Sequence, residues 1–279
     1  MNYAELCKNM KSFKKNGFEV GTYGTSVLGR DLFFLTAGVG DYKIIIQGAI
    51  HAREHITTNL IIKLCENLKN KSFFGAKFYF LPMTNPDGVE ICCNGASSVK
   101  DRSLRKQVAK ELETVDKGLY KANARLVDLN VNFPTQFGKG KQNLTYPHFE
   151  NYIGQCPFSE PETQALAKFT KEIQPKGTIS YHSKGEVIYF SFLNQKHFHK
   201  DFLIAKDVAD ETGYKLAEAK GSVGGYKDWC INSLGISSLT IEVGNDDLTH
   251  PIGVESLEEI YQKNKDVPLR YLKSILKYE

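Results

Sequence analysis

Short apolar runs alternate with amphipathic helical stretches along the whole chain. The run "YKIIIQGAI" (42–50) is rich in isoleucine and predicts a buried strand, and residues 55–70 follow it with apolar side chains four apart on one helical face. This alternation predicts an α/β/α sandwich, in which a mixed, mostly parallel twisted sheet carries helices on both faces. Further strands are expected within 76–88, 177–183, 187–192 and 237–244, and helices within 160–173, 199–213 and 256–276, the last interrupted by Pro268.

Nothing in the 279 residues divides the chain into separate units. There is no repeat, no low-complexity tract and no linker rich in proline, glycine or serine. We therefore expect one domain over residues 1–279, in which residues 1–40 supply an N-terminal helix and the first strands.

The bulk composition argues against two classes of partner. A net charge of +4 without a sustained basic stripe is too small to favour nucleic acid. No apolar run is long enough for a membrane span or a signal peptide, so we expect a cytoplasmic protein that does not bind a membrane. Six cysteines without a CxxC pair indicate reduced thiols, which fits the same compartment.

The segment "GAIHAREHITTNL" (48–60) brings two histidines, a glutamate and an arginine close together. It matches the inverted zinc-peptidase pattern H-x-x-E-H, in which both histidines bind zinc from one helical face. That pattern requires His51 and His55 on one helix turn, but His51 follows directly on a predicted strand. In the alternative, His51 and Glu54 are two ligands on a strand–helix loop, and a third comes from a distant segment.

Two further polar residues stand at predicted strand ends, where parallel sheets bind their ligands. His182 ends the strand in "ISYHSKG", and Glu242 is a lone carboxylate in the apolar strand "TIEVG". A catalytic zinc commonly takes two histidines and a carboxylate and keeps a fourth position for water. A charge such as that of Glu242 is costly to bury unless it is paired or functional.

The sequence resembles the carboxypeptidase A-like zinc peptidases over most of its length. Each resembling segment is weak alone, but all occur in the order that the family has. The segments are "IHAREH" (50–55), "TNPDGVE" (84–90), "NARLVDLNVNFP" (123–134), "SEPET" (159–163), "ISYHS" (179–183), "GGYKDW" (224–229) and "LTIEVG" (239–244).

The resemblance implies one zinc ion per chain, held by His51, Glu54 and His182, with Glu242 as general base and acid. Asp128 then corresponds to the residue that orients His51, and His55 is not a ligand. The remaining histidines have no such context, and we expect them on the surface. They are His148, His197, His199 and His250.

The negative charge that develops on the scissile carbonyl requires a cation opposite the metal. Arg53 and Arg125 are the candidates. We assign the carbonyl to Arg125, because the segment between Lys121 and Asp128 is shorter than in the animal enzymes, and we assign a substrate contact to Arg53.

Two departures from the family pattern bear on the substrate. In true carboxypeptidases an Asn-Arg pair clamps the terminal carboxylate of the substrate, whereas "DLNVNF" keeps Asn130 and has Val131 in place of the arginine. The mobile tyrosine of the family falls on Lys220, so its role is lost or passes to Tyr226. Lys227 aligns with the base of the specificity pocket, where it is either a surface lysine or a partner for a side chain that ends in a carboxylate.

These features are similar to the bacterial branch that cleaves γ-D-glutamyl–diaminopimelate bonds in peptidoglycan peptides. The expected substrate is therefore a muropeptide or stem peptide. A metallocarboxypeptidase that anchors the terminal carboxylate through Arg125 or Lys220 remains the alternative enzyme. A binding module with a degenerate zinc site is the non-enzymatic alternative, and the presence of Glu242 beside all three ligands argues against it.

Overall fold

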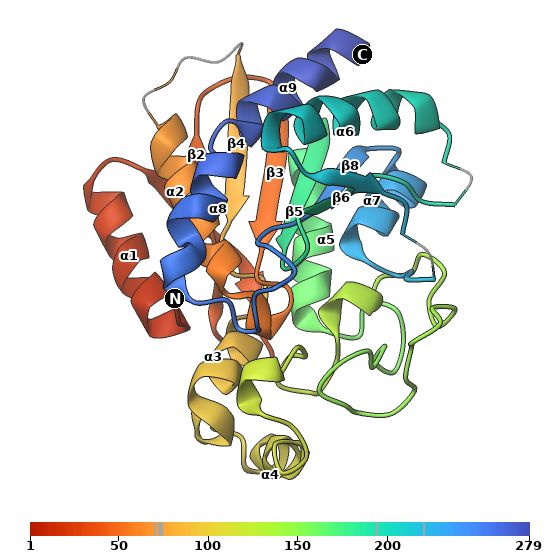
Figure 1. Cartoon of the computed structure of the whole chain (residues 1–279). Coiled ribbons are helices and arrows are strands. Elements are labelled where there is room, and N and C mark those ends of the chain that lie inside the picture. Colours follow the sequence, from red (N-terminus) through yellow and green to blue (C-terminus); the bar gives the residue numbers. More distant parts are fainter. Residues whose placement is uncertain (70, 72–74, 194, 220) are drawn as a thin grey trace.

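One sheet of eight strands runs through the described part of the chain, which comprises residues 1–69, 71, 75–193, 195–219 and 221–279 of a computed structural model. The strands are β1 (Glu19–Thr25), β2 (Asp31–Ala37), β3 (Tyr42–Gly48), β4 (Ala76–Leu81), β5 (Gly177–His182), β6 (Val187–Tyr189), β7 (Lys215–Ala217) and β8 (Ser237–Glu242). Their order in the sheet is β1-β2-β4-β3-β5-β8-β6-β7 (Figure 1).

The centre of this sheet is parallel. Strands β4, β3, β5 and β8 are parallel to one another. Strands β6 and β7 are parallel to each other, but β6 pairs antiparallel with β8. Strand β2 pairs antiparallel with both β1 and β4. The prediction of a mixed, mostly parallel sheet is confirmed. Strands β1 and β2, from the first 40 residues, belong to the same sheet as the rest of the chain.

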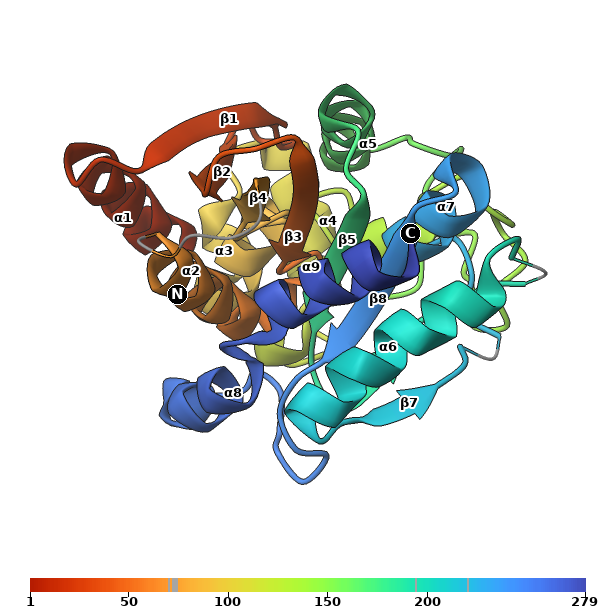
Figure 2. The ribbon, with the colours of Figure 1, turned by 90° about the horizontal axis from the view of Figure 1, so that it is seen from above.

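Helices cover both faces of the sheet, as predicted. Helices α1, α2, α6, α8 and α9 pack on one face, and α5 and α7 pack on the other (Figure 2). The helices are α1 (Tyr3–Lys15), α2 (Ile56–Leu68), α3 (Pro86–Asn94), α4 (Arg102–Glu111), α5 (Pro161–Ile173), α6 (Phe198–Thr212), α7 (Tyr226–Leu234), α8 (Leu257–Asn264) and α9 (Val267–Tyr278). Short 3-10 turns are η1 (Ala52–Glu54), η2 (Gly95–Ser98), η3 (Lys117–Leu119), η4 (Leu129–Val131) and η5 (Val254–Ser256).

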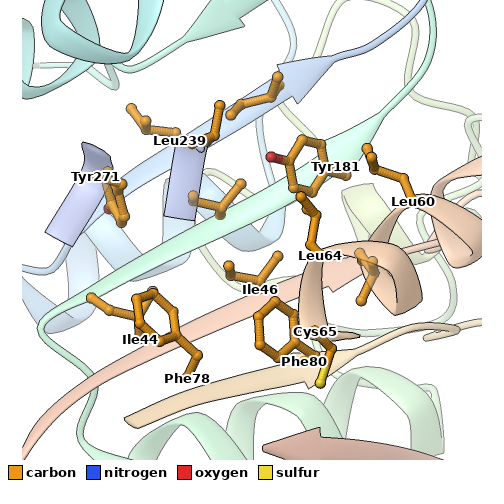
Figure 3. Close-up of a cluster of buried hydrophobic side chains, with 14 of the residues drawn as sticks. Ile44, Ile46, Leu60, Leu64, Cys65, Phe78, Phe80, Tyr181, Leu239 and Tyr271 are labelled. Atoms are coloured by element: carbon orange, nitrogen blue, oxygen red, sulfur yellow. The ribbon is translucent and has the colours of Figure 1, made fainter. Parts of the chain in front are cut away.

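The continuous apolar run of β3 is buried on both sides, which explains its composition. Ile44 and Ile46 point into the larger cluster under α2 and α9, and Ile45 points into the cluster under α5 and α7. Figure 3 shows Ile44 and Ile46 beside Phe78, Phe80 and side chains of α2. Fully burying one such side chain contributes about 1.5–3 kcal/mol.

Two prolines each lie in the first turn of a helix. The segment 85–88 (Asn-Pro-Asp-Gly) opens helix α3: Pro86 occupies the first turn, and the Asn85 side chain accepts a hydrogen bond from Gly88 N at 2.9 Å. Pro268 lies in the first turn of α9, and the break in the predicted 256–276 helix precedes it. No helix in the described ranges is long and apolar enough to cross a bilayer.

Candidate metal centre and active site

The loop after β3 positions two of the expected metal ligands. His51 has extended backbone angles (φ −92°, ψ 131°), Glu54 ends the short turn η1, and α2 begins only at Ile56. His51 and His55 are therefore not on one helix turn, and the geometry of the inverted zinc-peptidase pattern is absent from this segment. His55 lies outside the ligand cluster, and burial lowers its pKa to about 4.

His51, Glu54 and His182 converge in the interior, and all three are buried. His51 Nδ1 lies 2.9 Å from Glu54 Oε1, His182 Nδ1 lies 2.9 Å from Glu54 Oε2, and the two Nδ1 atoms are 3.1 Å apart. Zinc ligands at about 2.0–2.1 Å in tetrahedral geometry lie roughly 3.3 Å from one another. The donor set and its spacing are therefore compatible with zinc.

A buried network holds the far side of His51. Its Nε2 lies 3.3 Å from Asp128 Oδ1, which leaves Nδ1 for a metal, and Lys121 Nζ lies 3.2 Å from Asp128 Oδ2. Asn151 N also donates to Asp128 Oδ2 at 3.2 Å. Burial alone would raise the pKa of Asp128, but Lys121 and His51 hold it well below its usual range. Asp128 is thus an anionic acceptor that fixes the orientation of the His51 ring.

Glu242 ends β8 directly beside His182, which ends the neighbouring β5. Burial raises the pKa of the Glu242 carboxyl to about 7, with Glu54 adding to the rise and His182, Lys121 and Arg53 opposing it. A carboxyl with this pKa can both accept and return a proton near neutral pH.

A cavity of about 250 Å³ opens beside Glu242. The register of the sheet explains part of its wall, since Tyr189 on β6 pairs with Thr240, two residues before Glu242 on β8. These three side chains therefore share one face of the sheet. The polar side chains that line the cavity are Asn130, Tyr189, Ser222, Lys227, Asp228, Thr240 and Glu242.

The expected substrate-binding residues lie in different places. Asn130 and Lys227 line the cavity, and Lys220 lies outside the described residues. The expectation for Tyr226 is wrong. Its side chain is fully buried, shares a 2.8 Å hydrogen bond with Thr170, and packs in the core under α7.

A lysine that the sequence did not single out contacts Asp128, the residue that holds the His51 ring. Lys121 is largely buried against Asp128, and Lys121 and Arg53 are among the charges that lower the pKa of Glu242. Arg125 instead lies 3.7 Å from Glu160 with 49% of its side chain exposed. In the sequence, Lys121 was visible only as the one lysine in the mostly apolar segment 120–129.

The remaining histidines are only partly where we expected them. His197 and His199 are exposed, and His148 is half-buried near Glu111. His250 is not a plain surface residue, because its Nδ1 is sealed from solvent without a partner in the described ranges. Burial lowers its pKa to about 4, and Glu54, Arg53 and His51 are among the charges that act on it.

The sequence is similar to those of known proteins. The family described as zinc carboxypeptidase matches residues 3–266. Gamma-D-glutamyl-L-diamino acid endopeptidase 1 from Lysinibacillus sphaericus is 28% identical over an alignment of 255 residues, which covers 86% of this chain and 63% of that protein. Uncharacterized protein YqgT from Bacillus subtilis (strain 168) is 28% identical over an alignment of 274 residues, which covers 89% of this chain and 70% of that protein.

Solved structures share the fold. Bovine thrombin-activatable fibrinolysis inhibitor has a TM-score of 0.80 at 20% identity, over 100% of this chain and 98% of that one. Murein-tripeptide amidase MpaA from Escherichia coli O157 has a TM-score of 0.57 at 22% identity, over 90% and 91% of the two chains. The family match extends over most of the chain, and the buried His-Glu-His cluster is compatible with zinc. The protein therefore belongs to the zinc carboxypeptidase family of zinc metallopeptidases.

Proposed function

We propose that this protein hydrolyses the bond between γ-D-glutamate and meso-diaminopimelate in peptidoglycan stem peptides. The observation that carries the proposal is the cavity beside Glu242, which has Lys227 in its wall. By the family resemblance, Val131, which is buried, takes the position of the arginine with which a carboxypeptidase binds the terminal carboxylate. The name of the Lysinibacillus sphaericus relative describes an activity of the same kind.

His51, Glu54 and His182 would hold the zinc ion, with Asp128 fixing the ring of His51. When bound, zinc acidifies a water molecule and polarises the scissile carbonyl. Glu242 takes the proton from the attacking water and delivers it to the leaving amine, which is the α-amine of diaminopimelate. Its place beside His182 at the cavity edge suits both transfers.

Lys121 is our candidate for stabilising the negative charge that develops on the carbonyl oxygen, in place of Arg125. Its ammonium is held within the buried network of Asp128, whereas Arg125 reaches toward solvent and Glu160. A preorganised cation in a water-poor site is worth more than one in solvent, because it needs no reorganisation during the reaction. Arg53, with 21% of its side chain exposed, is the candidate for a substrate contact at the rim.

The absence of an arginine at position 131 makes a free carboxylate on the residue after the scissile bond dispensable. Asn130 remains as a neutral contact. Its Oδ1 accepts from Tyr226 N at 3.2 Å, and its amide nitrogen has no protein partner within the described ranges. We therefore expect cleavage of the γ-D-glutamyl bond whether or not D-alanine follows diaminopimelate.

Three substrates test this function. The zinc-loaded enzyme is given the free stem tripeptide L-alanyl-γ-D-glutamyl-meso-diaminopimelate, the tetrapeptide with an added D-alanine, and a hippuryl amino acid. We expect cleavage of the γ-D-glutamyl bond in the first two at similar rates and no cleavage of the third. The Glu242→Gln protein serves as the control for contaminating peptidases.

Two results would replace the proposal. Preference for the hippuryl amino acid, with γ-glutamyl bonds left intact, would establish the metallocarboxypeptidase alternative. Failure to cleave any of the three by protein with a full complement of zinc would favour the binding module.

A further inference from the structure

Two opposite charges lie side by side in the wall of the cavity beside Glu242. Lys227 and Asp228 are consecutive residues in the first turn of α7, and both line the cavity. They are 6% and 5% exposed, and Lys227 Nζ lies 2.6 Å from Asp228 Oδ1. This part of the wall therefore carries no net charge but keeps both signs.

Neither group has used all of its hydrogen-bonding capacity on the residues that the structure describes. The ammonium of Lys227 has three N–H donors, and two of them reach Ser191 O at 2.7 Å and Asp228 Oδ1 at 2.6 Å. The carboxylate of Asp228 can accept about four hydrogen bonds, and Gly225 N adds a second donor to it at 3.2 Å. Lys227 Nζ also lies 5.9 Å from the centre of the Phe192 ring, a weaker contact than a hydrogen bond. Among the described residues, one cationic donor and part of an anionic acceptor thus remain for a ligand.

Such a wall discriminates among the possible ends of a substrate side chain. An end with only a carboxylate would suit Lys227 but face the carboxylate of Asp228. An end with only an ammonium would suit Asp228 but face Lys227. An end with both groups on one carbon can pair each with its opposite and leave no charge unmatched in a buried site.

We propose that Lys227 and Asp228 together recognise a zwitterionic amino-acid end of the substrate side chain. The inference rests on the proposed function, in which that side chain belongs to diaminopimelate, whose distal carbon bears both an ammonium and a carboxylate. Lys227 donates to the distal carboxylate and Asp228 accepts from the distal ammonium. In a cross-linked wall the distal nitrogen is an uncharged amide, so the enzyme selects stem peptides whose diaminopimelate is not cross-linked.

Binding to a protein that cannot turn over tests this recognition independently of activity. The zinc-loaded Glu242→Gln protein is titrated calorimetrically with four γ-D-glutamyl peptides. They carry meso-diaminopimelate, its distal N-acetyl derivative, L-2-aminopimelate (no distal amine) or L-lysine (no distal carboxylate). We expect the unmodified diaminopimelate peptide to bind roughly ten- to a hundredfold more tightly than each of the others.

Variants in the same background assign the two contacts. Asp228→Asn, which can still accept from Gly225 N, should lose most of the preference for diaminopimelate over 2-aminopimelate and keep the preference over lysine. Lys227→Gln should show the reverse. Asn232→Ala, an exposed change on the same helix, is the matched control and should retain both preferences.

The outcomes separate this inference from the proposed function. Equal affinity of the Glu242→Gln protein for the diaminopimelate and 2-aminopimelate peptides would overturn recognition by Asp228, even if a variant failed to fold. Equal affinity for the lysine peptide would overturn recognition by Lys227. If the unmodified enzyme does not cleave the diaminopimelate peptide, the proposed function fails, and the order of affinities still decides the inference.

Discussion

His182 and Glu242 are register partners at the carboxyl ends of the adjacent parallel strands β5 and β8. The amide of Val243, the residue after Glu242, donates to the carbonyl oxygen of His182 at 2.8 Å. A candidate metal ligand and the candidate general base are therefore joined by the hydrogen bonds of the sheet itself. Their separation is fixed by strands and does not depend on loop conformation.

The ligand set predicts which histidine is needed for zinc. His182→Ala removes a nitrogen donor from the buried cluster, so the dialysed variant should contain far less than one zinc per chain. His55→Ala should keep its zinc, because His55 lies outside that cluster. Metal analysis by mass spectrometry checks both proteins. Zinc retained by the first and lost from the second would contradict the assignment.

Glu242→Gln should retain zinc and the fold but lose activity, since an amide cannot accept the proton of the attacking water. Loss of a general base typically lowers the rate by about 10²–10⁴, and by more when the same group also acts as the acid. The measurement is kcat on the stem tripeptide, with zinc content and circular dichroism as controls. Near-normal turnover would remove Glu242 from the mechanism.

Lys121 and Arg125 can be separated by their effects on kcat. Lys121→Met should lower kcat by about 10²–10³, the usual cost of losing one group that stabilises the developing charge. Arg125→Ala should change kcat only slightly, because its side chain is 49% exposed and pairs with Glu160. Zinc content must be measured in parallel, since Lys121 also contacts Asp128. Partial recovery in Lys121→Arg would support a role of the charge, and a larger loss in Arg125→Ala would reverse the assignment.

Glu162 makes the stability of the protein depend on pH. Burial, with a contribution from Asp87, raises the pKa of its carboxyl from 4.5 to about 8. Between these values the folded state keeps a proton that the unfolded chain has released. The contribution to the free energy of unfolding is therefore full below about pH 4.5 and is lost as the pH rises toward 8.

Glu162→Gln removes this titration, so its stability relative to the parent should rise between pH 5 and pH 8. The gain is on the order of 3 to 5 kcal/mol. Urea denaturation across this pH range measures it, and Glu172→Gln, an exposed change on the same helix, is the control. A pH-independent difference between Glu162→Gln and the parent would mean that Glu162 is ionised in the folded protein.

The sequence was most informative where strands end. Buried parallel strands appear as uninterrupted apolar runs, so the polar residues that follow them, His51 and His182, and the lone carboxylate Glu242 were visible as a group. Periodicity could not show which side of α7 faces the cavity. Tyr226 and Lys227 are neighbours, yet the first is in the core and the second in the cavity wall.

Lys121 was missed for a different reason. It lies in a loop whose path is set by long-range backbone hydrogen bonds, since Lys121 N and Ala122 N both donate to Phe149 O at 3.0 and 2.9 Å. No local pattern in residues 117–131 encodes that contact. Helix α3 was also missed, because proline in the first turn of a helix and proline in a turn look the same in sequence.

The candidate ligands lie at the edge of a sheet that is packed between two large apolar clusters. We therefore expect these apolar contacts to drive folding without the ion, so that the ion binds to a protein that is already folded. Its effect on stability follows mass action and reaches about 4 kcal/mol when free zinc exceeds its dissociation constant a thousandfold. A chelator should consequently strip the protein without unfolding it, and other divalent ions should be exchangeable into the same place.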